Sequence, residues 1–152
     1  AARFDTGDGT LVELPVKLKL HESVFVPLAK WAMLIAGNYR CVQPDGVRPI
    51  KEAVHADLAA TRAVYEWVVD LCVSLGAAPG DMVPFEKYAN AALSLGSPSS
   101  AARALAAGVP NIERVDLLVK SIAAQKGRQL AEVDAIVATV DGWLMRNRAK
   151  AA

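Results

Sequence analysis

The feature that most constrains this chain is an apolar-rich stretch from Pro49 to Leu75, which contains no glycine and is followed by Gly76. Its apolar residues recur at steps of three and four, the spacing of an α-helix: Ile50, Val54, Leu58, Tyr65, Val68, Cys72 and Leu75. The polar stripe is narrow, and a helix with so much apolar circumference is typical of an interior position. We therefore predict an all-α fold, a multi-helix bundle around one central helix over residues 49–75 that is roughly 40 Å long.

Prolines, glycines and capping residues divide the rest of the chain into shorter segments. We predict helices over about 23–37, 84–95, 101–107, 110–127 and 129–147. A chain of 152 residues is expected to form one domain. We assign residues 21–147 to that helical domain and expect a frayed tail over 148–152.

Residues 1–20 are the least helical part, and we interpret them as an extended linker or interdomain segment. Gly7-Asp8-Gly9 predicts a turn, and the alternation from Val16 to Leu20 is typical of a half-buried strand. An isolated strand or hairpin leaves its edges unpaired and is marginally stable. We therefore expect this segment to pair with a partner chain, with a missing domain, or with itself as a short hairpin.

Composition excludes several classes of protein. The formal net charge is +1 with both signs interspersed, which argues against a nucleic-acid binder. The longest uncharged apolar run, Trp31 to Gly37, is too short to cross a bilayer. The two cysteines have no histidine or cysteine at metal-ligand spacing, so we predict free thiols, no metal site and a cytoplasmic location.

No sharp catalytic signature is present: the chain lacks Gly-x-Gly-x-x-Gly, a P-loop, His-Glu-x-x-His and Gly-x-Ser-x-Gly. We therefore predict no cofactor-binding residues within it. Glu132 and Asp57 are unusual because each lies on or beside an apolar helix face. A partly desolvated carboxylate either meets a cation or acts at a site. The structural alternatives are a favourable helix dipole for Glu132 and an ion pair with Arg103 or Arg114 for Asp57.

Two polar segments are further candidates. The predicted loop 38–48 carries Asn38 and Arg40 among several polar groups, so it is either a wall of a site or a connector. The segment Ser97–Ser100 precedes a helix, with Arg103 one turn later. Such a segment binds a carboxylate or phosphate through its backbone N–H groups, or it only caps the helix.

Short motifs connect the chain with one family. Glu132-Val133-Asp134-Ala135-Ile136 opens the last predicted helix. Upstream, Lys19-Leu20, Pro27-Leu28 and Ser74-Leu75-Gly76 occur in this order. Through these motifs, residues 17–146 resemble the C-terminal helical domain of the ketopantoate reductase (2-dehydropantoate 2-reductase) family.

The resemblance implies a fold like the C-terminal domains of ketopantoate and 6-phosphogluconate dehydrogenases, and a function as the substrate-binding and dimerisation domain of an NAD(P)-dependent oxidoreductase. A Rossmann domain missing from this chain would bind NADP, and a 2-oxo acid would be reduced by hydride transfer. Lys19 would protonate the developing alkoxide, and Glu132 would orient a substrate hydroxyl. Ser121 lies near the family's serine, and we add Asn38 and Arg40 as substrate-binding candidates.

An isolated domain of this kind is expected to be inactive and to form a homodimer, because it exposes apolar surface that its missing half would cover. The alternative is a non-catalytic helical module for protein interaction or dimerisation. In that case the extended N-terminus and the apolar helix faces serve a partner protein.

Overall fold

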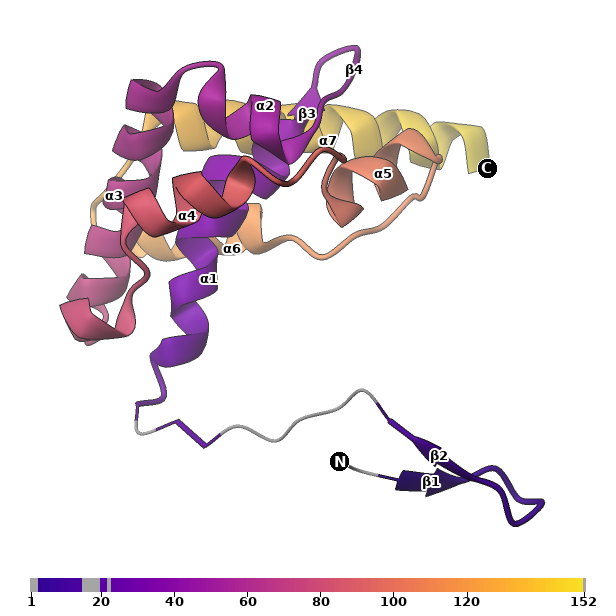
Figure 1. Cartoon of the computed structure of the whole chain (residues 1–152). Coiled ribbons are helices and arrows are strands. Elements are labelled where there is room, and N and C mark those ends of the chain that lie inside the picture. Colours follow the sequence, from indigo (N-terminus) through magenta and orange to yellow (C-terminus); the bar gives the residue numbers. More distant parts are fainter. Residues whose placement is uncertain (1–2, 15–19, 22, 152) are drawn as a thin grey trace.

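The computed structural model describes residues 3–14, 20–21 and 23–151, and it confirms that the fold is mostly helical (Figure 1). Its α-helices are α1 (Ala29–Met33), α2 (Ile50–His55), α3 (Leu58–Ser74), α4 (Phe85–Ala92), α5 (Ser100–Ala106), α6 (Val115–Gln125) and α7 (Ala131–Ala151). Two short hairpins pair β1 (Arg3–Asp5) with β2 (Leu11–Glu13) and β3 (Val42–Gln43) with β4 (Gly46–Val47). Short 3-10 turns cover Val26–Leu28, Tyr39–Cys41 and Pro79–Asp81.

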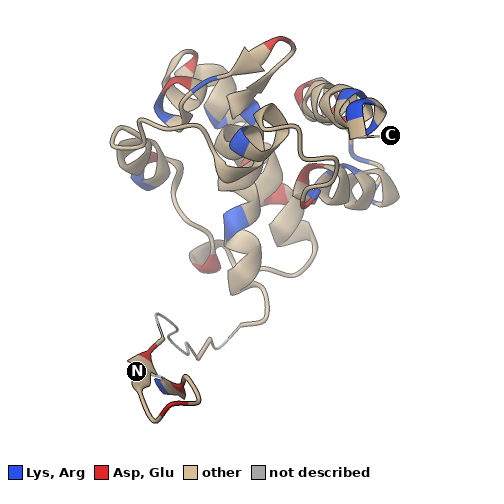
Figure 2. Cartoon of the chain, turned by 90° about the vertical axis from the view of Figure 1, so that its right-hand side faces the viewer, with Lys and Arg blue, Asp and Glu red and all other residues tan. Residues whose placement is uncertain are grey.

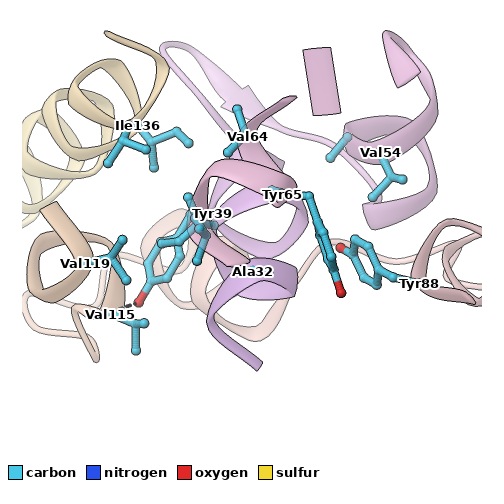
Figure 3. Close-up of a cluster of buried hydrophobic side chains, with 14 of the residues drawn as sticks. Ala32, Tyr39, Val54, Val64, Tyr65, Tyr88, Val115, Val119 and Ile136 are labelled. Atoms are coloured by element: carbon cyan, nitrogen blue, oxygen red, sulfur yellow. Dashed lines mark hydrogen bonds between the residues drawn. The ribbon is translucent and has the colours of Figure 1, made fainter. Parts of the chain in front are cut away.

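The first helical segment runs through the interior of the fold. Helix α1 continues into a π-helical segment over Leu34–Asn38, and this segment contacts α2, α3, α5 and α6. Ile35 and Ala36 are fully buried there. In Figure 3, Tyr39 and Val119 lie on one side of Ala32, and the stacked rings of Tyr65 and Tyr88 lie on the other. Apolar side chains from most helices therefore meet around residues 29–38.

The stretch 49–75 does not form the single helix that periodicity predicts, because the chain breaks between α2 and α3. Asp57 takes an extended conformation (φ −143°, ψ 92°), and its carboxylate accepts a hydrogen bond of 2.9 Å from the Ala60 amide. Asp57 is thus the exposed N-cap of α3. The alternative ion pair with Arg103 or Arg114 is not formed. Arg114 binds Asp116 and Asp141 instead, and Arg103 donates to the Pro98 carbonyl.

The buried Thr61 hydroxyl bonds to the backbone on both sides of this break. The Thr61 side chain is fully buried, and its Oγ1 lies 2.8 Å from both the Val54 and the Asp57 carbonyl oxygens. The same oxygen accepts a 2.6 Å hydrogen bond from Nη1 of Arg40. Backbone groups that the interrupted helix leaves unpaired are therefore satisfied by side chains.

The C-terminal helix is longer than predicted. We expected fraying over 148–152, but α7 continues to Ala151. Arg148 donates from Nε to the Pro110 carbonyl at 2.9 Å, which ties this last turn to the segment before α6. The segment 38–48, which we predicted as a loop, contains regular secondary structure, namely a 3-10 turn and the β3–β4 hairpin.

The N-terminal segment forms a short hairpin, one of the three arrangements expected. Gly7 and Gly9 have φ values of 94° and 83°, which a turn between β1 and β2 accommodates most easily with glycine. Every residue from 3 to 14 is exposed, and Figure 1 shows the hairpin apart from the helices. Residues 16–19, most of the predicted alternating strand from Val16 to Leu20, lie outside the described residues.

Charge is distributed over the fold without separating into large acidic and basic regions, as the interspersed blue and red segments of Figure 2 show. Among the described residues, none of the helices has the length and apolar character needed to cross a membrane.

Candidate functional site

The β3–β4 hairpin is fastened to α7 by two side chains of that helix. Trp143 donates from Nε1 to the Gln43 carbonyl at 2.7 Å, and Arg146 donates from Nη2 to the Pro44 carbonyl at 3.2 Å. The Arg146 guanidinium also lies 4.9 Å from the centre of the Trp143 ring, within the range of a cation–π contact. These contacts hold the hairpin against α7, and a surface depression lies between the hairpin and the first turns of the helix.

This depression is a cavity of about 310 Å³ lined by Arg40, Val42, Gln43, Pro44, Arg48, Glu132, Ala135, Ile136 and Thr139. We call it the Arg40–Arg48 cavity. Arg40 belongs to the 3-10 turn before β3, and Arg48 follows β4. Glu132 comes from the first turn of α7. A cavity of this size accommodates a small organic acid.

Both arginines are held in place by hydrogen bonds within the chain. Arg48 donates from Nε to the Arg40 carbonyl at 3.0 Å, and its amide donates to the Cys41 carbonyl at 2.9 Å. Arg40 uses Nη1 for its bonds to Thr61 and to the Ala36 carbonyl. Neither arginine makes a salt bridge with a carboxylate in the described part of the chain.

The electrostatics of the cavity favour an anion. Burial and then the positive charge of Arg48 lower the pKa of the Arg40 guanidinium, although Asp57 and Glu132 act in the opposite direction. An arginine guanidinium nevertheless keeps its positive charge at neutral pH. Two guanidinium groups that repel each other beside an open cavity are relieved by an anionic ligand.

The structure brings together two of the five predicted site residues, Arg40 and Glu132, in this cavity. Asn38 instead lines two other cavities, of about 320 and 400 Å³, on either side of α5's first turn. Ser121 is exposed on α6, and its hydroxyl donates to the Leu117 carbonyl of its own helix at 2.8 Å. Lys19 lies outside the described residues.

Sequence reasoning did not select Arg48, Gln43 or Thr139 as site residues. The available signal was the Pro44-Asp45 pair followed by Gly46, which is typical of a tight turn. That turn pairs Val42 with Val47, and this register returns Arg48 to the end of the 3-10 turn that carries Arg40.

A larger cavity, about 450 Å³, lies where α6 passes into α7 and is lined by Trp67, Lys120, Arg128, Leu130, Asp134 and their neighbours. Two charged groups of this cavity are paired with each other, because Lys120 lies 2.9 Å from Asp134, and Gln129 donates to the same carboxylate at 2.6 Å. These two hydrogen bonds, that of Gln129 first, lower the pKa of Asp134.

For the serine-rich segment, the structure favours capping over anion binding. The Ser99 hydroxyl accepts from the Ala102 amide at 3.2 Å and donates to the Asn38 carbonyl at 2.6 Å. Arg103 donates to the Pro98 carbonyl at 2.9 Å.

Both cysteines are free thiols in buried positions. Cys41 and Cys72 are both fully buried. Burial raises the pKa of Cys41, and it raises the pKa of Cys72 to about 11. A raised pKa disfavours the thiolate, which is the nucleophilic form of cysteine. The described residues contain no cluster of histidine, cysteine and carboxylate side chains that could hold a metal ion.

Comparison with known proteins gave no relative: no family model matches the chain, and no curated protein or solved structure matches it.

Proposed function

We propose that this chain is the substrate-binding and dimerisation domain of a ketopantoate-reductase-like oxidoreductase, and that the Arg40–Arg48 cavity binds the carboxylate of a small 2-oxo acid. NADP would be bound by a Rossmann domain outside this sequence. The observation that carries the proposal is that Arg40, Arg48 and Glu132 line one cavity of about 310 Å³.

The three charged groups suit different parts of such a substrate. Arg48 uses Nε for its backbone bond, so its terminal nitrogens are the donors that would receive a carboxylate, with the charge of Arg40 behind them. Glu132 is exposed at the rim, where it would accept a hydrogen bond from a hydroxyl group. Lys19 remains the proposed acid for the alkoxide.

Ligand titration of the full chain, followed by NMR chemical shifts, tests this proposal. The probe is 2-oxoisovalerate, and the matched control ligand is 3-methylbutan-2-one, which has a methyl group in place of the carboxylate. We expect saturable shifts around the cavity with the acid and none with the ketone. Equal responses to both ligands would contradict a carboxylate site.

The Arg48→Met variant provides the matched test in the protein. Because Arg40 also stabilises the α2–α3 break, Arg48 is the safer position to change. We expect the dissociation constant for 2-oxoisovalerate to rise about tenfold or more, as for a lost charged hydrogen bond. Arg128→Met removes the same charge from a different cavity and should leave binding unchanged. Unchanged binding in Arg48→Met would exclude this cavity as the site.

The second candidate is a non-catalytic helical module that binds a partner protein. The observation that favours it is the exposure of Phe4, Leu11 and Leu14 in the N-terminal hairpin. This function predicts self-association or partner binding through the hairpin and no response to 2-oxo acids.

A further inference from the structure

The β1–β2 hairpin exposes large apolar side chains to solvent. Phe4 is 59% exposed, Leu11 61% and Val12 44%. A two-stranded hairpin alone in water is marginally stable. An edge strand with apolar side chains and unpaired backbone groups is a template for pairing with another chain.

Strand β1 is complementary to itself in charge. Its three residues are Arg3, Phe4 and Asp5, so the charges are opposite on the two sides of a central aromatic residue. If two copies pair in antiparallel fashion about Phe4, Arg3 faces the partner's Asp5 and Asp5 faces the partner's Arg3. We propose that β1 pairs in this register with β1 of a second copy of this chain, which makes a four-stranded antiparallel sheet.

The backbone of β1 presents the right groups for this register. Within the hairpin, Phe4 faces Val12, and the Thr6 amide donates to the Thr10 carbonyl at 3.1 Å. The N–H and C=O of successive strand residues point to opposite edges. Residues Thr6 and Phe4 therefore turn these groups toward β2, and Arg3 and Asp5 turn theirs to the outer edge. These are the groups that the proposed pairing would bond across the two-fold axis.

The side chains also fit. Asp5 accepts from the Gly7 and Gly9 amides at 2.8 and 3.3 Å, both through Oδ1, so the turn orients the carboxylate and leaves Oδ2 for the partner's Arg3. Phe4 and Val12 share one face of the hairpin, because they are directly opposite each other in the register. In the four-stranded sheet, these two residues and their copies form one continuous apolar face, and the charge pairs lie on the other.

This inference specifies how the dimerisation part of the proposed function would occur, and it is independent of substrate binding. The Arg40–Arg48 cavity lies between the β3–β4 hairpin and α7. A chain that stays monomeric and still binds 2-oxo acids would therefore overturn this inference and leave the substrate assignment standing. A chain that dimerises through β1 but binds no 2-oxo acid would overturn the substrate assignment alone.

Cysteine cross-linking of the full chain tests the register. Phe4→Cys places a thiol opposite its own copy in a non-hydrogen-bonded pair, where the Cα atoms are about 4.5 Å apart, close enough for a disulfide. Val12→Cys, on the same face but on β2, lies about 14 Å from its copy, three strand spacings away. Under mild oxidation we expect a covalent dimer from Phe4→Cys and none from Val12→Cys, with the buried Cys41 and Cys72 unreactive. No dimer from Phe4→Cys, or equal amounts from both variants, overturns the inference.

A charge exchange tests the pairing without a covalent bond. Arg3 and Glu13 are opposite each other within the hairpin, so the double variant Arg3→Glu/Glu13→Arg keeps that internal pair and reverses its polarity. In the proposed register it places a negative charge at position 3 opposite the partner's Asp5, which is also negatively charged. In sedimentation velocity we expect its dimer dissociation constant to rise about tenfold, and Arg3→Lys to remain near the unmodified chain. An unmodified chain that stays monomeric up to about 1 mM, or a charge exchange without effect, overturns the inference.

Discussion

At the scale of single residues, Gly37 is a glycine that is needed for close packing, although in the sequence it resembles a helix terminator. A Cβ atom at Gly37 would collide with the Tyr88 hydroxyl and lie 3.3 Å from Cγ2 of Val54. The Tyr88 hydroxyl occupies that space because it donates to the Met33 carbonyl at 3.2 Å. From the sequence we predicted that Gly37 and Asn38 end a helix, yet the chain continues helical through Cys41. The glycine is required for close approach rather than for termination.

Gly37→Ala is therefore expected to lower the free energy of unfolding by about 1–3 kcal/mol, the cost of overpacking a tight site. The matched control is Gly142→Ala in α7, where the nearest atom to the new Cβ is Arg146 Nη1 at 3.6 Å. Higher helix propensity should raise the free energy of unfolding of this variant by about 0.5–1 kcal/mol. Urea denaturation followed by circular dichroism measures both. A Gly37→Ala variant as stable as the unmodified chain would contradict this explanation.

At the scale of elements, apolar periodicity predicts the two helices α2 and α3 but not the break between them. The apolar spacing correctly predicts helical structure on both sides of Asp57. It placed Asp57 on an apolar face only because it assumed one unbroken helix. A capping side chain, supported by Thr61 and Arg40, competes successfully with helix continuity at this point.

Asp57→Ala should lower the free energy of unfolding by about 1 kcal/mol, because the Ala60 amide loses its capping oxygen. Asp57→Asn retains a capping oxygen and should have a smaller effect. Asp70→Ala removes the same residue type from the exposed side of α3, and its effect should stay within about 0.5 kcal/mol. Chemical denaturation of the three variants provides the comparison. Equal effects of Asp57→Ala and Asp70→Ala would show that the cap contributes nothing.

At the scale of the whole molecule, the N-terminal hairpin and the helical core are expected to be energetically separate. Residues 3–14 are all exposed, and the buried core begins with Ala29. Deleting residues 1–14 should change the free energy of unfolding of the helices by no more than about 0.5 kcal/mol when measured at concentrations where the chain is monomeric. Thermal or urea unfolding monitored by helical circular dichroism tests this. A loss of several kcal/mol would mean that the hairpin supports the helical core.

The helices and the N-terminal turn could be predicted from the sequence because their signals are local. Apolar periodicity, prolines, glycines and the Gly7-Asp8-Gly9 turn act within a few residues of the structure that they specify. By itself the sequence thus determined the helical class, the approximate limits of α4 and α5 and the turn of the first hairpin, whereas α6 begins at Val115 instead of near residue 110 and α7 continues to Ala151.

Only the tertiary structure decided which polar residues share a cavity. Arg40 and Glu132 were predicted as site residues for separate reasons, and packing of the β3–β4 hairpin on α7 placed them together with Arg48. Packing also directed Asn38 and Ser121 elsewhere, and it made Gly37 necessary to accommodate Tyr88. These outcomes depend on contacts between residues that are distant along the chain. Because the free energy of such contacts arises only when the elements pack against one another, no local pattern in the sequence encodes them.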